Sequence, residues 1–114
     1  MGVKASELEE ARTTALQEGL QIVGVHYYRG TGTIHTDHFL EPFSALMKVA
    51  RYFLADLEYV GVGGGFGYQY MPVGPPDFDW DYFGTCITRM MESLSAEAGR
   101  RISLFLEPGR SVVA

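Results

Sequence analysis

The alternation of helix and strand is the feature of this sequence that most limits how the chain can fold. Apolar residues spaced by three and four predict three helices, over about residues 6–18, 36–57 and 79–98. Short runs rich in Ile, Val, Leu and Tyr predict three buried strands, over about residues 21–28, 58–62 and 102–106. This order indicates an α/β fold with parallel strands and right-handed crossovers.

A sheet of three parallel strands is small for a complete domain. It has two unpaired edges, and too few helices to cover both of its faces. No linker, internal repeat or low-complexity segment divides the 114 residues. We therefore expect the chain to be one part of a larger barrel or wound sheet, and to be poorly stable or self-associating when isolated.

Composition and charge narrow the class of protein. Apolar residues make up 46% and charged residues 20%, as in ordinary soluble globular proteins. The net charge of −5 argues against nucleic acid and anionic membranes as partners, because both favour a basic surface. The sequence shows no secretory signal and no apolar run of the roughly 20 residues that a membrane helix needs. A single cysteine, Cys86, excludes an internal disulfide, and we expect a cytoplasmic protein.

The first residues have two interpretations. Residues 1–6 fit the loose pattern for N-terminal myristoylation. Ser6 and Glu9 also fit a capping box at the start of the first helix. We favour the cap, because the lipidation pattern is short and often matched by chance.

A glycine run follows the second predicted strand. Gly63, Gly64 and Gly65 are consecutive, and Gly67 comes two residues later. Without Cβ atoms, such a run can turn several backbone N–H groups toward one anion, as in a phosphate cradle. It can equally be a tight turn from strand to loop, and the run alone does not decide between the two.

A second candidate anion site, Glu107-Pro108-Gly109-Arg110, follows the third predicted strand. An arginine beside a glycine N–H can hold an anion, although a turn with a surface salt bridge explains the same residues. Both candidates stand at the carboxyl ends of neighbouring parallel strands. In (β/α)8 barrels the loops after strands seven and eight often form a phosphate site, so the pair together favours phosphate binding.

Three segments, residues 24–31, 63–67 and 107–110, resemble in order and spacing three motifs of the ornithine/diaminopimelate decarboxylase family, the fold-type III decarboxylases that depend on pyridoxal 5′-phosphate (PLP). The resemblance covers nearly the whole chain. It implies a partial (β/α)8 TIM-type barrel of about three βα units, approximately strands six to eight. Residues 1–114 would then be a partial PLP-binding barrel domain.

The resemblance also implies a role for each matching residue. Backbone N–H groups of the glycine run and the hydroxyl of Thr31 would hold the phosphate of PLP, and the last motif would hold it from the other side. The phosphate-binding residues would thus be Thr31, Gly63, Gly64, Gly65, Gly109 and Arg110. Glu107 would be the catalytic carboxylate that keeps the pyridine nitrogen protonated, so that the ring accepts the electrons left when CO2 departs. The ring of Tyr28 would stack on the pyridine face.

The chain departs from the family at several positions. The family usually has histidine where this chain has Tyr28, and His26 matches an earlier histidine of many diaminopimelate decarboxylases, although a core histidine explains it as well. PLP enzymes also need a Schiff-base lysine. We expect Lys4 to lie in a loop and Lys48 in the middle of a helix, away from the site. The family's C-terminal domain, which supplies substrate-binding residues across a dimer interface, has no counterpart here.

Two functions follow from the resemblance. The first is PLP-dependent decarboxylation of an amino acid or diamino acid, with this chain supplying the phosphate and pyridine-nitrogen site of a homodimeric parent enzyme. The alternative is a non-catalytic remnant or regulator that binds PLP weakly or pairs with a full-length relative. A third interpretation keeps a barrel fragment that binds another phosphate ester.

The remaining candidate residues favour structural roles. His35 and His38 lack a third ligand nearby, so we expect no metal site. Asp77, Asp79 and Asp81 surround the start of the third helix, where acidic side chains are favourable. Cys86 is expected to be buried and inert.

Overall fold

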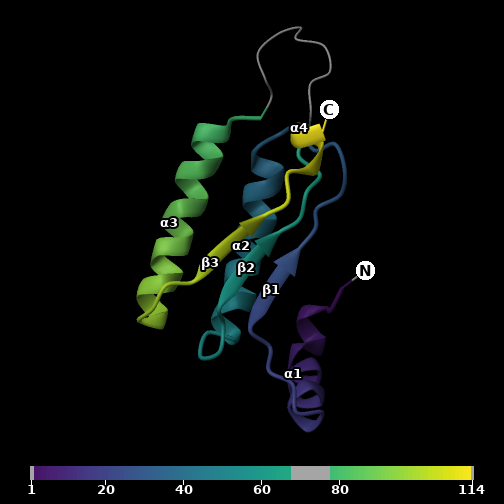
Figure 1. Cartoon of the computed structure of the whole chain (residues 1–114), viewed down its shortest axis with the longest axis vertical. Coiled ribbons are helices and arrows are strands. Elements are labelled where there is room, and N and C mark those ends of the chain that lie inside the picture. Colours follow the sequence, from purple (N-terminus) through teal and green to yellow (C-terminus); the bar gives the residue numbers. More distant parts are fainter. Residues whose placement is uncertain (1, 68–77, 114) are drawn as a thin grey trace, which may run out of the picture.

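The computed structural model describes residues 2–67 and 78–113 and confirms the α/β order (Figure 1). Its elements are, in chain order, η1 (Ala5–Glu7), α1 (Leu8–Gln17), β1 (Gly24–Tyr27), α2 (Asp37–Tyr52), β2 (Tyr59–Val62), α3 (Trp80–Ala98), β3 (Ser103–Leu106) and α4 (Gly109–Val113). None of the described helices is both long and apolar enough to cross a membrane.

The three strands form one sheet in the order β1-β2-β3, and both pairs are parallel. Gly24 lies opposite Tyr59, and Gly61 lies opposite Phe105. The parallel sheet that the sequence predicts is therefore confirmed. Because parallel strands all end at one edge, the loops that follow β1, β2 and β3 emerge together, beside α4 in Figure 1.

Helices α2 and α3 pack on one face of the sheet and form the core with it. Alternate strand residues point to this face, and Val25 and Val60 are buried there. The buried residues of the two helices recur by three and four along each helix: Phe39, Leu40, Phe43, Leu46, Met47 and Ala50 on α2, and Phe83, Ile87, Met91 and Leu94 on α3. An aromatic cluster of Phe39, Phe66, Phe78 and Phe83 closes the core near the carboxyl ends of the strands.

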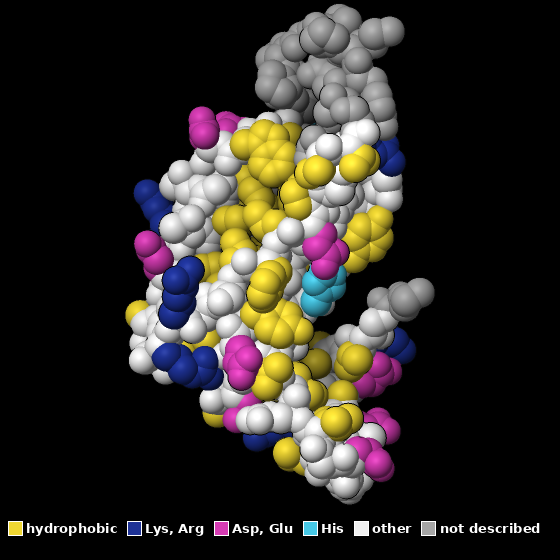
Figure 2. Space-filling view, viewed as in Figure 1, with side chains coloured by type: hydrophobic (Ala, Val, Ile, Leu, Met, Phe, Trp, Pro, Cys, Tyr) yellow, Lys and Arg dark blue, Asp and Glu magenta, His cyan; other side chains and the backbone are white. Residues whose placement is uncertain are grey.

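The opposite face of the sheet is open. In the view of Figures 1 and 2 the sheet lies in front of α2, and Figure 2 shows apolar side chains running along the strands. Phe105 is 55% exposed on this face, 5.3 Å from Tyr59 between ring centroids. The ring of Tyr59 lies where a Cβ of Gly24 would be, and the ring of His26 lies where a Cβ of Gly61 would be. Large rings of one strand thus occupy the space left by glycines of its neighbour.

At the internal proline of α2, a hydrogen bond from the loop after β1 replaces one that the helix lacks. Pro42 has no N–H, so it cannot donate to the carbonyl of His38 four residues earlier. The Nε of Arg29 donates to that carbonyl instead, at 3.1 Å. The helix keeps its carbonyl satisfied, and the loop gains a fixed point on α2.

Some local expectations are wrong. The N-terminal cap is formed by Lys4, whose backbone N–H donates to Oε2 of Glu7 at 2.9 Å, and not by Ser6 with Glu9. The second helix ends at Tyr52 and not near Leu57, and Arg100 donates to backbone carbonyls of the segment that follows it. Cys86 is half-buried, not fully buried.

The start of α3 matches expectation only in part. Asp79 is its N-cap, with Oδ1 accepting from the N–H of Tyr82 at 2.8 Å, whereas Asp77 lies outside the described residues. Thr36 is the N-cap residue of α2, but its side chain does not cap that helix. Its buried hydroxyl instead accepts from the N–H of Asp79 at 2.8 Å. This bond joins the beginnings of α2 and α3.

The structure of the core predicts that substitutions of two phenylalanines differ greatly in their effect on the free energy of unfolding. Phe39 is fully buried in the aromatic cluster, so Phe39→Ala should lower the free energy of unfolding by about 3–5 kcal/mol. Phe105→Ala, on the open face, should change it by less than about 1 kcal/mol. Urea unfolding of both variants measures the difference, and equal losses would contradict this assignment of the core.

Tyr27 should make stability depend on pH in the alkaline range. Its hydroxyl donates to the carbonyl of Phe39 at 2.9 Å, and burial raises the pKa of Tyr27 to about 12 from 10.0. A raised pKa favours the neutral phenol in the fold, so this stability is present below pH 10 and is lost as pH rises toward 12. The stability advantage of the wild type over Tyr27→Phe should shrink by about 2 kcal/mol across that range in urea unfolding. A constant difference would contradict the pKa assignment.

Candidate anion-binding site

The sequence-predicted site residues gather at the carboxyl edge of the sheet. Tyr28 follows β1, Gly63 follows β2 and Glu107 follows β3, and each comes directly after the last residue of its strand. The N–H of Glu107 donates to the carbonyl of Val62 at 3.2 Å, and the N–H of Gly63 donates to the carbonyl of Tyr27 at 2.8 Å. The parallel pairing therefore continues one step past the strands and holds these three residues side by side.

The glycine run is the crossing point of three segments. A Cβ on Gly64 would lie 2.5 Å from the carbonyl oxygen of Glu107. Gly65 has a φ of +96°, and a Cβ there would overlap the carbonyl oxygen of Gly30. The packing of the loops against one another is thus sufficient reason for glycine at positions 64 and 65.

The N–H groups of the run are not equivalent. The N–H of Gly63 is already used in the sheet. Within the described part of the chain, no protein acceptor is bonded to the N–H of Gly64 or Gly65. The expected cradle therefore narrows to the N–H groups of these two glycines.

The loop after β1 is attached to the glycine run on both sides of Phe66. The N–H of Thr33 donates to the carbonyl of Gly65 at 3.0 Å, and the N–H of Gly67 donates to the carbonyl of Thr33 at 2.7 Å. Phe66 itself is buried and stacks on Phe39, with 4.4 Å between ring centroids and 9° between ring planes. The run is consequently fixed to the core and to the neighbouring loop at once.

Tyr28 and Thr31 are joined by a hydrogen bond between their hydroxyl groups, at 2.6 Å. The ring of Tyr28 is 59% exposed, and its Cδ2 lies 3.0 Å from the position of a Cβ on Gly63. The structure thus brings two of the predicted residues together beside the glycine run, with the face of one ring accessible to a ligand.

The last motif begins a short helix that the sequence analysis missed. Helix α4 starts at Gly109, directly after Pro108. Proline near the first helical position is the sequence signal that could have predicted this helix. The N–H of Gly109 donates to the carbonyl of Glu107 at 2.9 Å, so it is already engaged. The side chains of Glu107 and Arg110 are both exposed at this edge.

Lys4, His35 and His38 make contacts of their own. Lys4 pairs with Glu7 beside η1, with 3.7 Å between Nζ and Oε1, and Lys48 is exposed in the middle of α2. The rings of His35 and His38 meet edge to face at 5.2 Å between centroids. In residues 2–67 and 78–113, no three His, Cys, Asp or Glu side chains gather in a group that could hold a metal ion.

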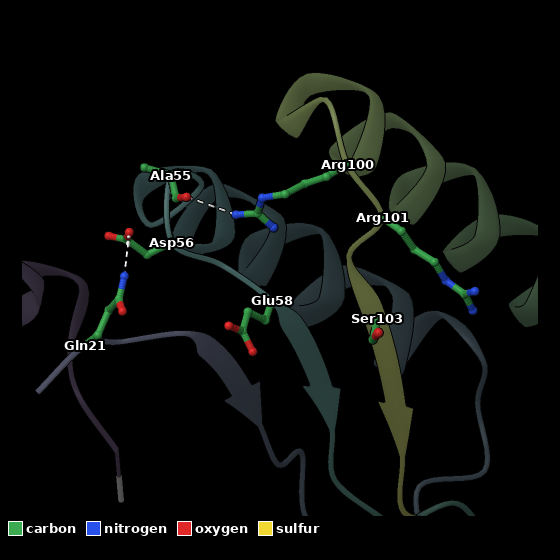
Figure 3. A pocket seen from close by; sticks show the side chains of 7 residues that line it. All are labelled: Gln21, Ala55, Asp56, Glu58, Arg100, Arg101 and Ser103. Carbon is green, nitrogen blue, oxygen red and sulfur yellow. Dashed lines mark hydrogen bonds between the residues drawn. The ribbon is translucent and has the colours of Figure 1, made fainter.

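A cavity of about 500 Å³ lies at the opposite end of the sheet (Figure 3). Some of its polar groups bond to one another: Gln21 Nε2 donates to Asp56 Oδ1 at 2.7 Å, and Arg100 donates to the carbonyl of Ala55 at 3.0 Å. Figure 3 shows Arg101 pointing away from these groups. None of the predicted site residues lines this cavity, so we assign it to the scaffold.

Comparison with known proteins places these observations in a family. The family described as "Pyridoxal-dependent decarboxylase, pyridoxal binding domain" matches residues 1–114. The chain is 30% identical over 113 residues to a diaminopimelate decarboxylase of Streptomyces coelicolor, covering 99% of this chain and 25% of that one. It is 33% identical over 117 residues to that of Methanothermobacter thermautotrophicus, covering 98% and 27%. The chain thus spans about a quarter of the length of these relatives.

Solved structures give the same result. A crystal structure of a diaminopimelate decarboxylase superposes with a TM-score of 0.81 at 26% identity, over 96% of this chain and 25% of that one. The arginine decarboxylase of Paramecium bursaria Chlorella virus superposes with a TM-score of 0.71 at 15% identity, over 96% of this chain and 28% of that one, which shows a shared fold.

Gly65→Ala should release the loop after β1 from the glycine run. The new Cβ would overlap the carbonyl oxygen of Gly30 in a backbone conformation that costs about 1–3 kcal/mol for residues other than glycine. We expect lower stability in urea unfolding and faster hydrogen exchange at the N–H of Thr33. Gly84→Ala, in open space on α3, is the matched control and should gain about 0.5–1 kcal/mol. Unchanged exchange at Thr33 in Gly65→Ala would rule out the contact.

Proposed function

Because the chain belongs to the pyridoxal-dependent decarboxylase family, we propose that it forms the part of such an enzyme that holds the phosphate and the ring of PLP. One observation carries the proposal. Tyr28, the glycine run and Glu107 come from three different loops and meet at one edge of the sheet. Family membership implies PLP as the cofactor.

The architecture that we propose is a partial (β/α)8 barrel, with β1, β2 and β3 as approximately strands six to eight and residues 1–114 as a partial PLP-binding domain. The open face of the sheet supports it. In a closed barrel the faces of the strands opposite to the helices fill the interior with side chains. His26, Tyr59 and Phe105 lie on that face, their rings fitted against glycines or one another.

The residues at the carboxyl edge fit the chemical groups of PLP. The N–H groups of Gly64 and Gly65 have no acceptor within the described residues, and a phosphate oxygen can be that acceptor. Thr31 adds a hydroxyl, and Arg110 on α4 adds a positive charge beside the same edge. Gly63 and Gly109 then shape the backbone, because their own N–H groups are engaged.

Glu107 and Tyr28 are proposed to act on the ring. When bound, PLP supplies an electron sink for the electron pair that remains when CO2 leaves an amino acid. A carboxylate such as Glu107 holds a proton on the pyridine nitrogen and thereby strengthens that sink. The exposed ring of Tyr28 is a stacking platform, and its bond to Thr31 sets the orientation of the ring.

The covalent anchor for the cofactor has to come from another segment. PLP enzymes hold the cofactor through a lysine, and neither Lys4 beside η1 nor Lys48 on α2 is near the carboxyl edge. This observation favours two forms of the proposal. Either a longer polypeptide or a partner supplies the lysine, or the chain is a non-catalytic remnant or regulator that binds PLP weakly or pairs with a full-length relative.

The proposed substrate class is an amino acid or diamino acid. Similar proteins are described as diaminopimelate decarboxylases, and similar structures as arginine and lysine/ornithine decarboxylases. The proposed assembly is a homodimer of the parent enzyme. The net charge of −5 keeps nucleic acid and anionic membranes disfavoured as partners.

PLP binding by the purified 114-residue chain tests the proposal. Trp80 is a suitable reporter, because its ring lies 5.1 Å from that of Phe66, next to the glycine run. We expect saturable quenching of Trp80 fluorescence, lost in the double variant Gly64→Asp, Arg110→Ala. The new carboxylate would crowd the carbonyl of Glu107 and repel the phosphate, and the second change removes a positive charge.

The double variant Gly19→Asp, Arg89→Ala is the matched control. It makes the same two chemical changes at Gly19, where a Cβ meets open space and aspartate is among the residues that best tolerate the φ of +70°, and at Arg89, which is exposed on α3. The control should bind PLP as the wild type does. A folded wild-type chain without saturable quenching, or equal binding by both double variants, would overturn the proposed cradle.

A further inference from the structure

We propose that His26 is a positioning residue of this site, and that its protonated imidazole raises the affinity of the carboxyl edge for the anionic cofactor. The inference rests on the function proposed above. It concerns the open face of the sheet one step below the predicted ring and phosphate contacts, where the structure places an exposed imidazole.

His26 and Tyr28 converge on a single point above Gly63. The position that a Cβ of Gly63 would take lies 3.1 Å from Nε2 of His26 and 3.0 Å from Cδ2 of Tyr28. Tyr28 directly follows β1, and the parallel pairing continues one step past the strand, so its side chain and that of His26 project from the same face. A ligand stacked on the ring of Tyr28 is consequently a close neighbour of the imidazole.

Gly61 sets the direction of the imidazole. The Nδ1 edge of His26 lies where a Cβ of Gly61 would be, and the Nε2 edge lies toward Gly63. The ring therefore points along β2 toward the carboxyl edge of the sheet. Any side chain at position 61 would push the imidazole off this course.

His26 brings to this face of the sheet a side chain that can carry a positive charge. By strand alternation, the titratable groups on the same face are Tyr28, directly after β1, Tyr59 on β2, and Glu107, directly after β3, while Phe105 lies opposite Gly61. Tyrosines are neutral near pH 7, and Glu107 is an anion that opposes binding of phosphate. The hydroxyl of Tyr28 is already bonded to Thr31. A protonated imidazole at His26 adds a positive charge at this edge, opposite in sign to the charge of Glu107.

Binding of pyridoxine 5′-phosphate by the full chain, followed by calorimetry from pH 6 to pH 8, tests this inference. This probe keeps the ring and phosphate but has no aldehyde, so it cannot react with Lys4 or Lys48. The wild-type affinity should fall with pH by about fivefold more than that of His26→Gln, because the variant loses a charge-assisted interaction. Any change common to both proteins comes from the titration of the probe itself.

Two further variants separate the role of the imidazole from a general effect on the fold. Gly61→Ala displaces the ring and should show the weak pH dependence of His26→Gln. His35→Gln removes another exposed histidine and should keep the wild-type pH dependence. Equal pH dependence in the wild type and His26→Gln overturns this inference and leaves the proposed function standing. No saturable binding by the folded wild type at any pH overturns both.

Discussion

Stacking of Phe66 on Phe39 is the interaction on which the carboxyl edge of this sheet depends. Phe66 sits directly after the glycine run, and its burial fixes the run against the core through α2. The loop after β1 is held to the core by its hydrogen bonds to the residues on either side of Phe66 and by the bond from Arg29 to the carbonyl of His38 on α2. A flexible glycine segment becomes an ordered crossing point because an aromatic ring at its end is held on several sides.

Sequence analysis correctly predicted a parallel sheet with the candidate residues at one edge, and this prediction depends on periodicity and on parallel pairing. Alternating elements led to a parallel sheet, and a parallel sheet brings Tyr28, Gly63 and Glu107 to one edge. What it missed depends on contacts between residues distant in sequence. The N–H of Gly63 is bonded within the sheet, and a Cβ on Gly65 would overlap the carbonyl oxygen of Gly30. Both facts follow from the way the loops cross, and no local sequence pattern encodes them.

Helix ends were the least predictable elements, for the same physical reason. After α2 ends at Tyr52, the carbonyls of the following segment accept from the guanidinium of Arg100, which lies more than forty residues later. Arg100 and the cavity in Figure 3 belong to the amino end of the strands, opposite to the candidate site. The contacts of Arg100 at the amino end of the strands thus serve stability, whereas the carboxyl edge carries the candidate site. This division is typical of parallel α/β folds.

Within the described residues the sheet has two unpaired edges that are unlike each other, and this constrains how copies of the chain can meet. Strand order β1-β2-β3 with parallel pairing leaves β1 exposed on one side and β3 on the other. Two copies related by a twofold axis through one edge would have to pair antiparallel. Continuation of the native pattern joins β3 of one copy to β1 of the next, which is a heterologous contact that closes into a ring or grows into an open ribbon. The direction of the edge strands, rather than the hydrophobicity of the open face, decides between these assemblies.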